Sequence, residues 1–211
     1  MRWSIVLAAG SGTRFGTRKQ FASADGRRLV DLAVETAVAA SDRTVLVLPA
    51  GQPWTGPRVD HIVIGGSDRA GSVRAGLAAI PDRTGIVVVH QAANPLAPVE
   101  LFAALFAAVE AGAAGAFPGL RPADLVRRAH GDTAGAVVGR DDLVLVQTPA
   151  AFRLEVLRAA HALDLDALED TARVTAAGYQ LRILPGDPSN VHVATVEDLR
   201  LVEALLAARR R

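Results

Sequence analysis

The sequence alternates short apolar runs with longer segments of helical periodicity, and this alternation limits the possible folds more than any other feature. The runs are rich in β-branched residues and apolar on both faces, as strands of a buried parallel sheet must be. They span Ser4–Leu7, Thr44–Leu48, His61–Ile64, Ile86–Val89, Leu143–Val146 and Leu181–Leu184. Helices are predicted over Leu29–Ala40, Ser72–Ala79, Pro98–Ala111, Arg153–Leu163, Asp170–Ala177 and Val196–Ala208. The pattern predicts an α/β fold with an open, mostly parallel sheet and right-handed crossovers.

One segment departs from the alternation. Residues 124–139 read as two strands around a polar turn at His130–Thr133, which predicts a β-hairpin inserted into the α/β domain. Such a hairpin is either an arm that packs on a partner chain or an ordinary hairpin at the sheet edge. The sequence shows no internal repeat and no low-complexity linker, so we expect residues 1–211 to form a single domain.

Composition excludes several classes of protein. Half of the 211 residues are hydrophobic, which is enough for a proper core and excludes a disordered chain. There is no cysteine, so disulfides and thiolate metal sites are excluded, and a reducing cytoplasm is a compatible location. The 23 basic residues nearly balance the 22 acidic ones, which argues against a nucleic-acid partner. No apolar run reaches the length of a membrane span, so we expect no membrane partner.

A glycine-rich segment follows the first predicted strand directly, over residues 7–16. Ligands of open α/β sheets bind at the carboxyl ends of strands, where small residues let backbone N–H groups approach a phosphate. The segment lacks the Gly-Lys-Ser/Thr ending of a P-loop, and Gly16 falls one place late for a dinucleotide fingerprint. The remaining interpretation is a nucleotide loop that carries its own cations.

Arg14 and Lys19 are those cations. Attack on an α-phosphate builds negative charge on its non-bridging oxygens, and a guanidinium with an ammonium can stabilise that charge. The alternative interpretation is that both are ordinary surface cations.

Ordered segments along essentially the whole chain resemble the 2-C-methyl-D-erythritol 4-phosphate cytidylyltransferases. They are Leu7–Phe15 with Lys19–Gln20, Gly65–Leu77, Val87–Pro95, Gln147–Phe152, and Pro185–Thr195 with Glu197–Leu199. The resemblance implies a nucleotidyltransferase (Rossmann-like) fold and a homodimer that exchanges an arm between subunits. It also implies transfer of CMP from CTP to a sugar-alcohol phosphate with Mg²⁺ and release of pyrophosphate, a step of non-mevalonate isoprenoid biosynthesis.

The resemblance also implies a set of site residues, carried over by position. Transition-state stabilisation falls to Arg14 and Lys19. Nucleotide binding falls to Ala8, Ala9, Gly10, Gly12, Gly66, Ser67, Arg69, Ser72 and Ala92. Substrate binding falls to Arg140, Thr148 and His192, with Arg140 reaching the partner's site from the arm. Gln91 stands at the metal position.

The departures from the family pattern gather at the metal and acceptor sites. Gln91 replaces the metal-binding aspartate, and Ser189 stands where a second acid belongs. An amide brings no negative charge, whereas Mg²⁺ prefers hard anionic oxygen. Asn94 replaces an arginine of the same metal-site motif, and on the acceptor side His192 replaces a lysine and Glu169 a threonine.

Three functions therefore remain open at this point. The chain is a cytidylyltransferase with the family activity, or a catalytically impaired paralogue that binds CTP or only dimerises. The third alternative is a nucleotidyltransferase with a different, less anionic acceptor, because Glu169 and a neutral His192 suit a phosphate monoester poorly.

Overall fold

The computed structural model describes residues 1–10, 18–81 and 85–210. Its centre is an eight-stranded sheet with the order β10-β7-β11-β6-β1-β4-β5, in which β12 also pairs with β7. The strands are β1 (Arg2–Leu7), β4 (Arg43–Leu48), β5 (His61–Ile64), β6 (Ile86–Gln91), β7 (Gly115–Leu120), β10 (Leu145–Val146), β11 (Ala150–Arg153) and β12 (Arg182–Pro185). The pairs β1–β4, β1–β6, β4–β5 and β7–β12 are parallel, whereas β11 and β10 run antiparallel to their neighbours. The mostly parallel α/β sheet is confirmed.

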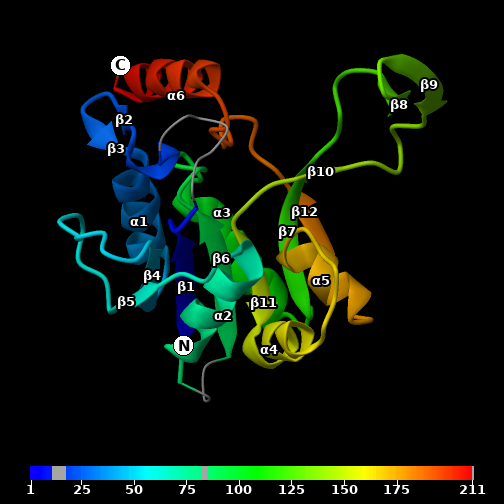
Figure 1. Ribbon diagram of the computed structural model, residues 1–211. Coiled ribbons are helices and arrows are strands. Elements are labelled where there is room, and N and C mark those ends of the chain that lie inside the picture. The colour runs from blue at the N-terminus through cyan, green and yellow to red at the C-terminus, as the bar shows by residue number, and fades with distance from the viewer. Residues whose placement is uncertain (11–17, 82–84, 211) are drawn as a thin grey trace.

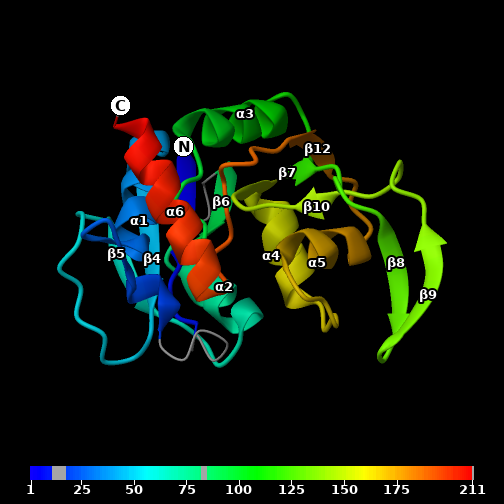
Figure 2. The same ribbon diagram turned by 90° about the horizontal axis from the view of Figure 1, so that it is seen from above.

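Helices cover both faces of this sheet (Figures 1 and 2). The long helices are α1 (Leu29–Ala40), α2 (Arg69–Ala78), α3 (Val99–Glu110), α4 (Leu154–Ala162), α5 (Asp170–Ala176) and α6 (Val196–Arg209), and a short 3-10 turn, η2, spans Lys19–Phe21. One core joins α1 and α3 to Val6 of β1, while a second core joins α2 and α4 to Ile5 of the same strand. Because neighbouring residues of a strand point to opposite faces, β1 must be apolar at both positions.

The C-terminal helix α6 lies above the carboxyl end of the sheet, beside the small hairpin of β2 (Ser23–Ala24) and β3 (Arg27–Arg28) (Figure 1). It begins at a capping box, in which the Thr195 hydroxyl accepts from the Asp198 N–H and the Asp198 carboxylate accepts from the Thr195 N–H. Val202 of α6 is buried in a third cluster with Leu96 and Val193. This packing brings the segment before α6 close to the end of β6. No helix within the described ranges is long and apolar enough to cross a membrane.

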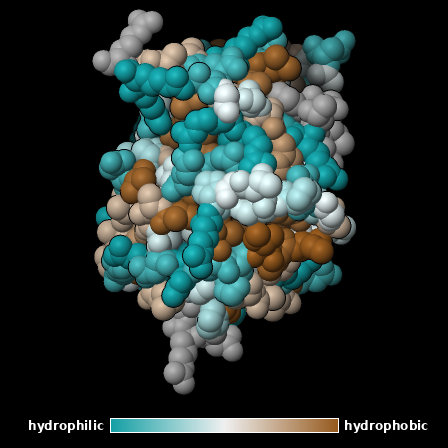
Figure 3. Space-filling model, turned by 90° about the vertical axis from the view of Figure 1, so that its left-hand side faces the viewer, coloured by the Kyte–Doolittle hydropathy of each residue, from teal (hydrophilic) through white to brown (hydrophobic). Residues whose placement is uncertain are grey.

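Three of the predicted strands are not buried on both faces, because they lie at edges of the sheet. Ile64 of β5 is 64% exposed and Ile183 of β12 is 51% exposed. The predicted strand Leu143–Val146 shrinks to the exposed two-residue β10. The face beside β4 and β5 is largely hydrophilic, with small separate groups of apolar side chains (Figure 3).

Two strands, β7 and β11, were not predicted. The β7 sequence contains Gly115, Pro118 and Gly119, which resemble turn signals. Gly115 is required by packing, because a Cβ there would lie 2.6 Å from the Phe152 ring and 2.8 Å from the Ala151 carbonyl oxygen. The close approach of β11 to β7 is therefore a long-range effect that local sequence does not reveal.

The predicted hairpin at 124–139 is confirmed. Strands β8 (Val126–His130) and β9 (Thr133–Val138) form a separate two-stranded sheet, and Gly131 in their turn has a φ of +64°. Figures 1 and 2 both show this hairpin projecting away from the body of the molecule. Most of its residues are exposed.

Candidate active site

A cavity of about 400 Å³ opens where β1 and β6 end. The register pairs Leu7 of β1 with Gln91 of β6 and with Val47 of β4, so the carboxyl ends of these strands meet at one edge. The lining residues come from four segments: Leu7, Ala8, Ala9 and Gly10; Lys19 and Gln20; Gly66, Ser67, Asp68, Arg69 and Ser72; Gln91 and Ala93. This is the position at which open α/β sheets bind ligands.

Gln20 holds the start of the glycine loop in place. Its side-chain Nε2 donates to the carbonyl oxygens of Ala8 and Gly10, at 2.7 and 2.8 Å, and the residue is only 4% exposed. With those carbonyls turned toward Gln20, the backbone next to the cavity has a fixed orientation. We did not predict this role, although Gln20 stands in one of the segments that resemble the family.

Two glycines allow close packing in the opposite wall of the cavity, one against the loop and one against the start of α2. A Cβ on Gly65 would collide with the Ala9 Cβ, and a Cβ on Gly66 would lie 2.7 Å from the backbone of Gly71. Helix α2 begins immediately afterwards and is capped by Asp68, whose carboxylate accepts from the Gly71 N–H at 2.5 Å. The positive end of the helix therefore lies at the cavity, where it favours an anion.

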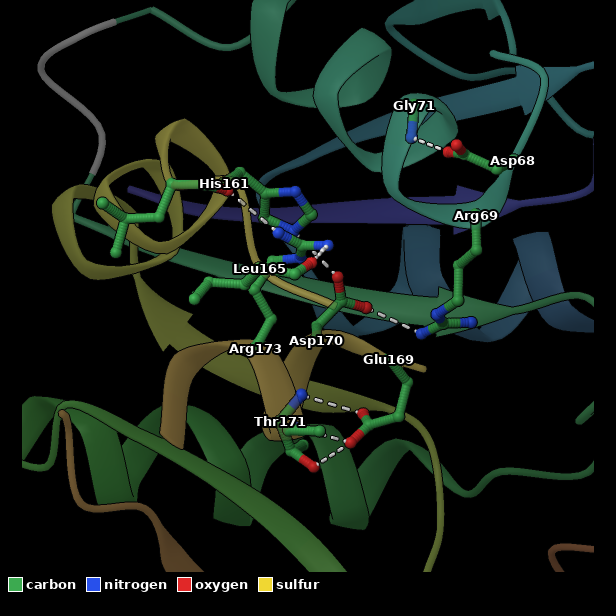
Figure 4. A network of polar contacts seen from close by, with 11 residues as sticks. Asp68, Arg69, Gly71, His161, Leu165, Glu169, Asp170, Thr171 and Arg173 are labelled. Atoms are coloured by element: carbon green, nitrogen blue, oxygen red, sulfur yellow. Dashed lines mark hydrogen bonds and ion pairs between the residues drawn. The ribbon is translucent and has the colours of Figure 1, made fainter. Parts of the chain in front are cut away.

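Arg69 is held at the cavity by a partly buried ion pair (Figure 4). Its Nη2 lies 2.7 Å from an oxygen of Asp170, whose other oxygen lies 3.0 Å from Nε2 of His161. Burial alone would raise the pKa of Asp170, but the hydrogen bond with His161 and the charge of Arg69 outweigh it and keep the pKa below its ordinary value. The pair fastens α2 to α4 and α5.

On the other side of the cavity, Lys19 belongs to a polar network. Its Nζ donates to the Val193 carbonyl oxygen at 2.6 Å and lies 3.3 Å from Nε2 of His192. Nδ1 of His192 lies 2.9 Å from Oδ1 of Asn94, which also accepts from the Thr148 hydroxyl at 3.1 Å. Asn94, 2% exposed, is the centre of this network, and its part in it was not predicted.

The structure brings most of the predicted site residues together. Ala8, Ala9, Gly10, Lys19, Gly66, Ser67, Arg69, Ser72 and Gln91 all line the cavity. Thr148 and His192 lie beside it in the Lys19 network. Ala92 is fully buried, and its neighbour Ala93 lines the cavity in its place. Gly12 and Arg14 lie outside the described residues.

Arg140 is not at the cavity of its own chain. It follows the hairpin and its Nη1 donates to the Ala123 carbonyl oxygen at 2.5 Å, at the base of that hairpin. Glu169 caps the N-terminus of α5 (Figure 4). Its carboxylate accepts from the N–H groups of Thr171 and Ala172 and from the Thr171 hydroxyl.

The side chains at the cavity do not fit a Mg²⁺ site built by the protein. Gln91 offers a neutral amide, and the carboxylate of Asp68 caps α2. Ser189, at the second acid position, receives a hydrogen bond from Arg209 of α6. Within residues 1–10, 18–81 and 85–210, no three His, Asp or Glu side chains gather as metal ligands would.

Comparison with known proteins identifies the family. Residues 3–208 match the family model described as 2-C-methyl-D-erythritol 4-phosphate cytidylyltransferase. The chain belongs to this family. A cytidylyltransferase of that name from Nocardia farcinica is 38% identical over 98% of this chain and 94% of its own length. One from Deinococcus radiodurans is also 38% identical, over 96% of this chain and 88% of its own length.

A solved structure agrees with this membership. The crystal structure of the 2-C-methyl-D-erythritol 4-phosphate cytidylyltransferase from Thermus thermophilus superimposes with a TM-score of 0.84 and 29% sequence identity, covering 96% of this chain and 98% of that one. The cavity at the ends of β1 and β6 therefore lies in a cytidylyltransferase fold, and its cations Lys19 and Arg69 suit a polyphosphate ligand.

Proposed function

We propose that this chain transfers CMP from CTP to 2-C-methyl-D-erythritol 4-phosphate, a step of isoprenoid biosynthesis. A phosphate oxygen of the acceptor forms a bond to the α-phosphorus of CTP, the bond from that phosphorus to the bridging oxygen breaks, and pyrophosphate leaves. The observation that carries the proposal is the cavity itself: a glycine loop, a helix N-terminus and two cations meet at the carboxyl edge of the sheet in a chain of this family.

The chain's own residues divide the work as follows. The backbone of Ala8, Ala9 and Gly10, held by Gln20, lies against the nucleotide together with Gly66, Ser67 and Ser72. Arg69, whose guanidinium is paired with Asp170, and Lys19 counter the phosphate charge. Arg14 and Gly12 belong to the glycine-rich segment that also contains Gly10. Thr148 and His192, which belong to the same polar network as Lys19, bind the acceptor substrate.

We further propose a cytoplasmic homodimer of single-domain subunits. The hairpin at 124–139 serves as the exchanged arm and carries Arg140 to the acceptor site of the partner. Arg140 does not line the cavity of its own chain, and the hairpin projects from the body of the molecule, which together support this arrangement.

A second candidate is favoured by the neutral side chains at the metal and acceptor positions. Gln91, Asn94 and His192 remove the charges that the family pattern places there. A nucleotidyltransferase with a less anionic acceptor, or a chain that binds CTP without fast turnover, would suit this neutral lining.

The deciding experiment measures pyrophosphate release from CTP and methylerythritol phosphate with Mg²⁺, beside the variant Gln91→Asp. Release that requires both substrates supports the family activity. Release by the variant alone would show an impaired cytidylyltransferase scaffold. Silence from both chains, with CTP still bound, would replace the proposal with the second candidate.

A further inference from the structure

The orientation of three amide and imidazole groups beside the cavity follows from one backbone carbonyl. Nδ2 of Asn190 donates to the Thr148 carbonyl oxygen at 2.7 Å. A carbonyl can only accept, so the amide nitrogen of Asn190 faces Thr148 and its Oδ1 faces Asn94. Asn190 is 2% exposed, so the surrounding protein holds its amide in this orientation.

The orientation of Asn94 follows in turn. Its Nδ2 lies 3.3 Å from Oδ1 and 3.4 Å from the backbone oxygen of Asn190, and both of these atoms are acceptors. Its Oδ1 must therefore point the other way, toward the Thr148 hydroxyl and Nδ1 of His192.

This fixes the proton on His192. Because Oδ1 of Asn94 accepts at 2.9 Å, Nδ1 of His192 carries the hydrogen. The other ring nitrogen, Nε2, lies 3.3 Å from Nζ of Lys19, and an ammonium group only donates. An attractive contact requires a lone pair on Nε2, which gives a neutral ring with its hydrogen on Nδ1, against the pull of the nearby Asp198 charge toward the imidazolium.

We propose that His192 is a positioning residue that directs the Lys19 ammonium beside the nucleotide cavity, and that Asn94 keeps His192 in the Nδ1–H form which this contact requires. Two acceptors in the described part of the chain then help to set the direction of Lys19: Nε2 of His192 and the carbonyl oxygen of the next residue, Val193. Asn94 and His192 thus work as a matched neutral pair. The kinetic consequence rests on the proposed function, whereas the position of the proton does not.

The first test reads the proton directly. Nitrogen-15 NMR of the full chain near neutral pH distinguishes the two tautomers and the imidazolium, and the His192→Gln spectrum identifies the His192 signals among the five histidines. We expect the Nδ1–H form, and we expect Lys19→Met to shift the Nε2 signal. An Nε2–H form, an imidazolium, or an Nε2 signal indifferent to Lys19→Met would overturn the proposal, even if the chain proved inactive on CTP.

The second test uses two variants that each keep half of the imidazole. The amide of His192→Gln reaches the position of Nε2 and can still accept from Lys19, whereas that of His192→Asn reaches only the position of Nδ1 and keeps the contact with Asn94. We expect kcat to be about tenfold lower for His192→Asn than for His192→Gln, with little difference between the two in the KM for CTP. Equal losses in the two variants, or a loss confined to KM, would show that His192 does not act through Lys19.

Asn94→Asp supplies an independent variant, with folding checked by thermal melting. It keeps an acceptor for Nδ1 but places an anion beside the ring, which favours the imidazolium and turns an N–H toward Lys19. The expected result is an imidazolium signal together with a lower kcat. A neutral ring with lower kcat, or an imidazolium with unchanged kcat, would contradict the link between the two residues.

Discussion

At the scale of single residues, the glycines around the cavity differ in what a side chain would meet. A Cβ on Gly66 would collide with the backbone of Gly71 at 2.7 Å, whereas a Cβ on Gly10 meets none of the described atoms within 4 Å. Both residues line the cavity. One is therefore needed for packing, and the other leaves space for a ligand.

These two glycines give opposite expectations. Gly66→Ala should lower the free energy of unfolding by about 1–3 kcal/mol, because backbone atoms cannot easily move aside. Gly10→Val should leave it within about 0.5 kcal/mol but weaken CTP binding about tenfold or more, since its methyl groups occupy the cavity. Chemical denaturation and calorimetric titration measure the two quantities. A destabilised Gly10→Val chain with unchanged CTP affinity would reverse the assignment.

His90, at the end of β6, predicts an acid-sensitive stability. The ring is fully buried against Phe102, and burial lowers the pKa of His90 to about 3. The unfolded chain takes up this proton near pH 6.5, so the full stability is present above that pH and is lost as the pH falls. We expect a slope of about 1.4 kcal/mol per pH unit between about pH 6 and pH 4.

The variant His90→Leu isolates this contribution. In the described part of the chain neither ring nitrogen of His90 has a well-aligned hydrogen-bond partner, and the backbone of Asn94 makes only a weak contact, so an apolar side chain of similar size should cost little at neutral pH. The difference in unfolding free energy between the two chains, measured by urea denaturation across this pH range, should move steadily in favour of the variant as the pH falls. A difference independent of pH would mean that His90 is not the acid-sensitive group.

At the scale of elements, Asp170 joins three helices around the cavity. Its carboxylate is 4% exposed and contacts Arg69 of α2 and His161 of α4. We expect Asp170→Asn to lower the free energy of unfolding by about 2–4 kcal/mol, because it leaves a partly buried guanidinium without its counter-charge. CTP affinity should fall about three- to tenfold, since Arg69 lines the cavity.

A matched control lies in the loop before α5. Asp166 is exposed and lies shortly before Asp170 in the sequence. Asp166→Asn removes one negative charge, as Asp170→Asn does, but should change the free energy of unfolding by less than about 0.5 kcal/mol. Equal effects of the two substitutions would indicate a general charge effect instead of the ion pair.

The sequence predicted those elements whose packing is decided locally. The helices and the strands β1, β4 and β6 were found because both of their faces meet apolar neighbours. Strand β7 was missed because Gly115 resembles a turn residue. It is a glycine because it packs against the ring of Phe152, which is 37 positions away in the chain. Likewise, the cavity-lining residues Lys19, Gly66 and Arg69 stand in recognisable segments, but Asn94 acquires its central place only through contacts with Thr148, Asn190 and His192.

At the scale of the whole molecule, the proposed dimer makes each site depend on two chains. Lys19 lines the cavity of its own subunit, and Arg140 stands at the base of the projecting hairpin. If the arm is exchanged, the two residues that complete one site come from different subunits.

Mixing two inactive chains tests this arrangement. Lys19→Ala and Arg140→Ala should each lose most activity, and a refolded equal mixture should recover about a quarter of it, since half of the dimers are mixed and each holds one intact site. Pyrophosphate release measures the recovery, and a mixture of Lys19→Ala with unmodified chain calibrates it. A mixture no more active than its components would place Arg140 outside the partner's site.

The position of β11 between β6 and β7 has a consequence for synthesis on the ribosome. Strands β4, β1 and β6 come from the first 91 residues and can pair as soon as they emerge. Strand β7 emerges next but has no place beside β6, because that edge belongs to residues 150–153. While the hairpin is being synthesised, the sheet of the nascent chain is therefore incomplete and the edge of β6 is unpaired. This edge is covered only when β11 has been synthesised and pairs with β6.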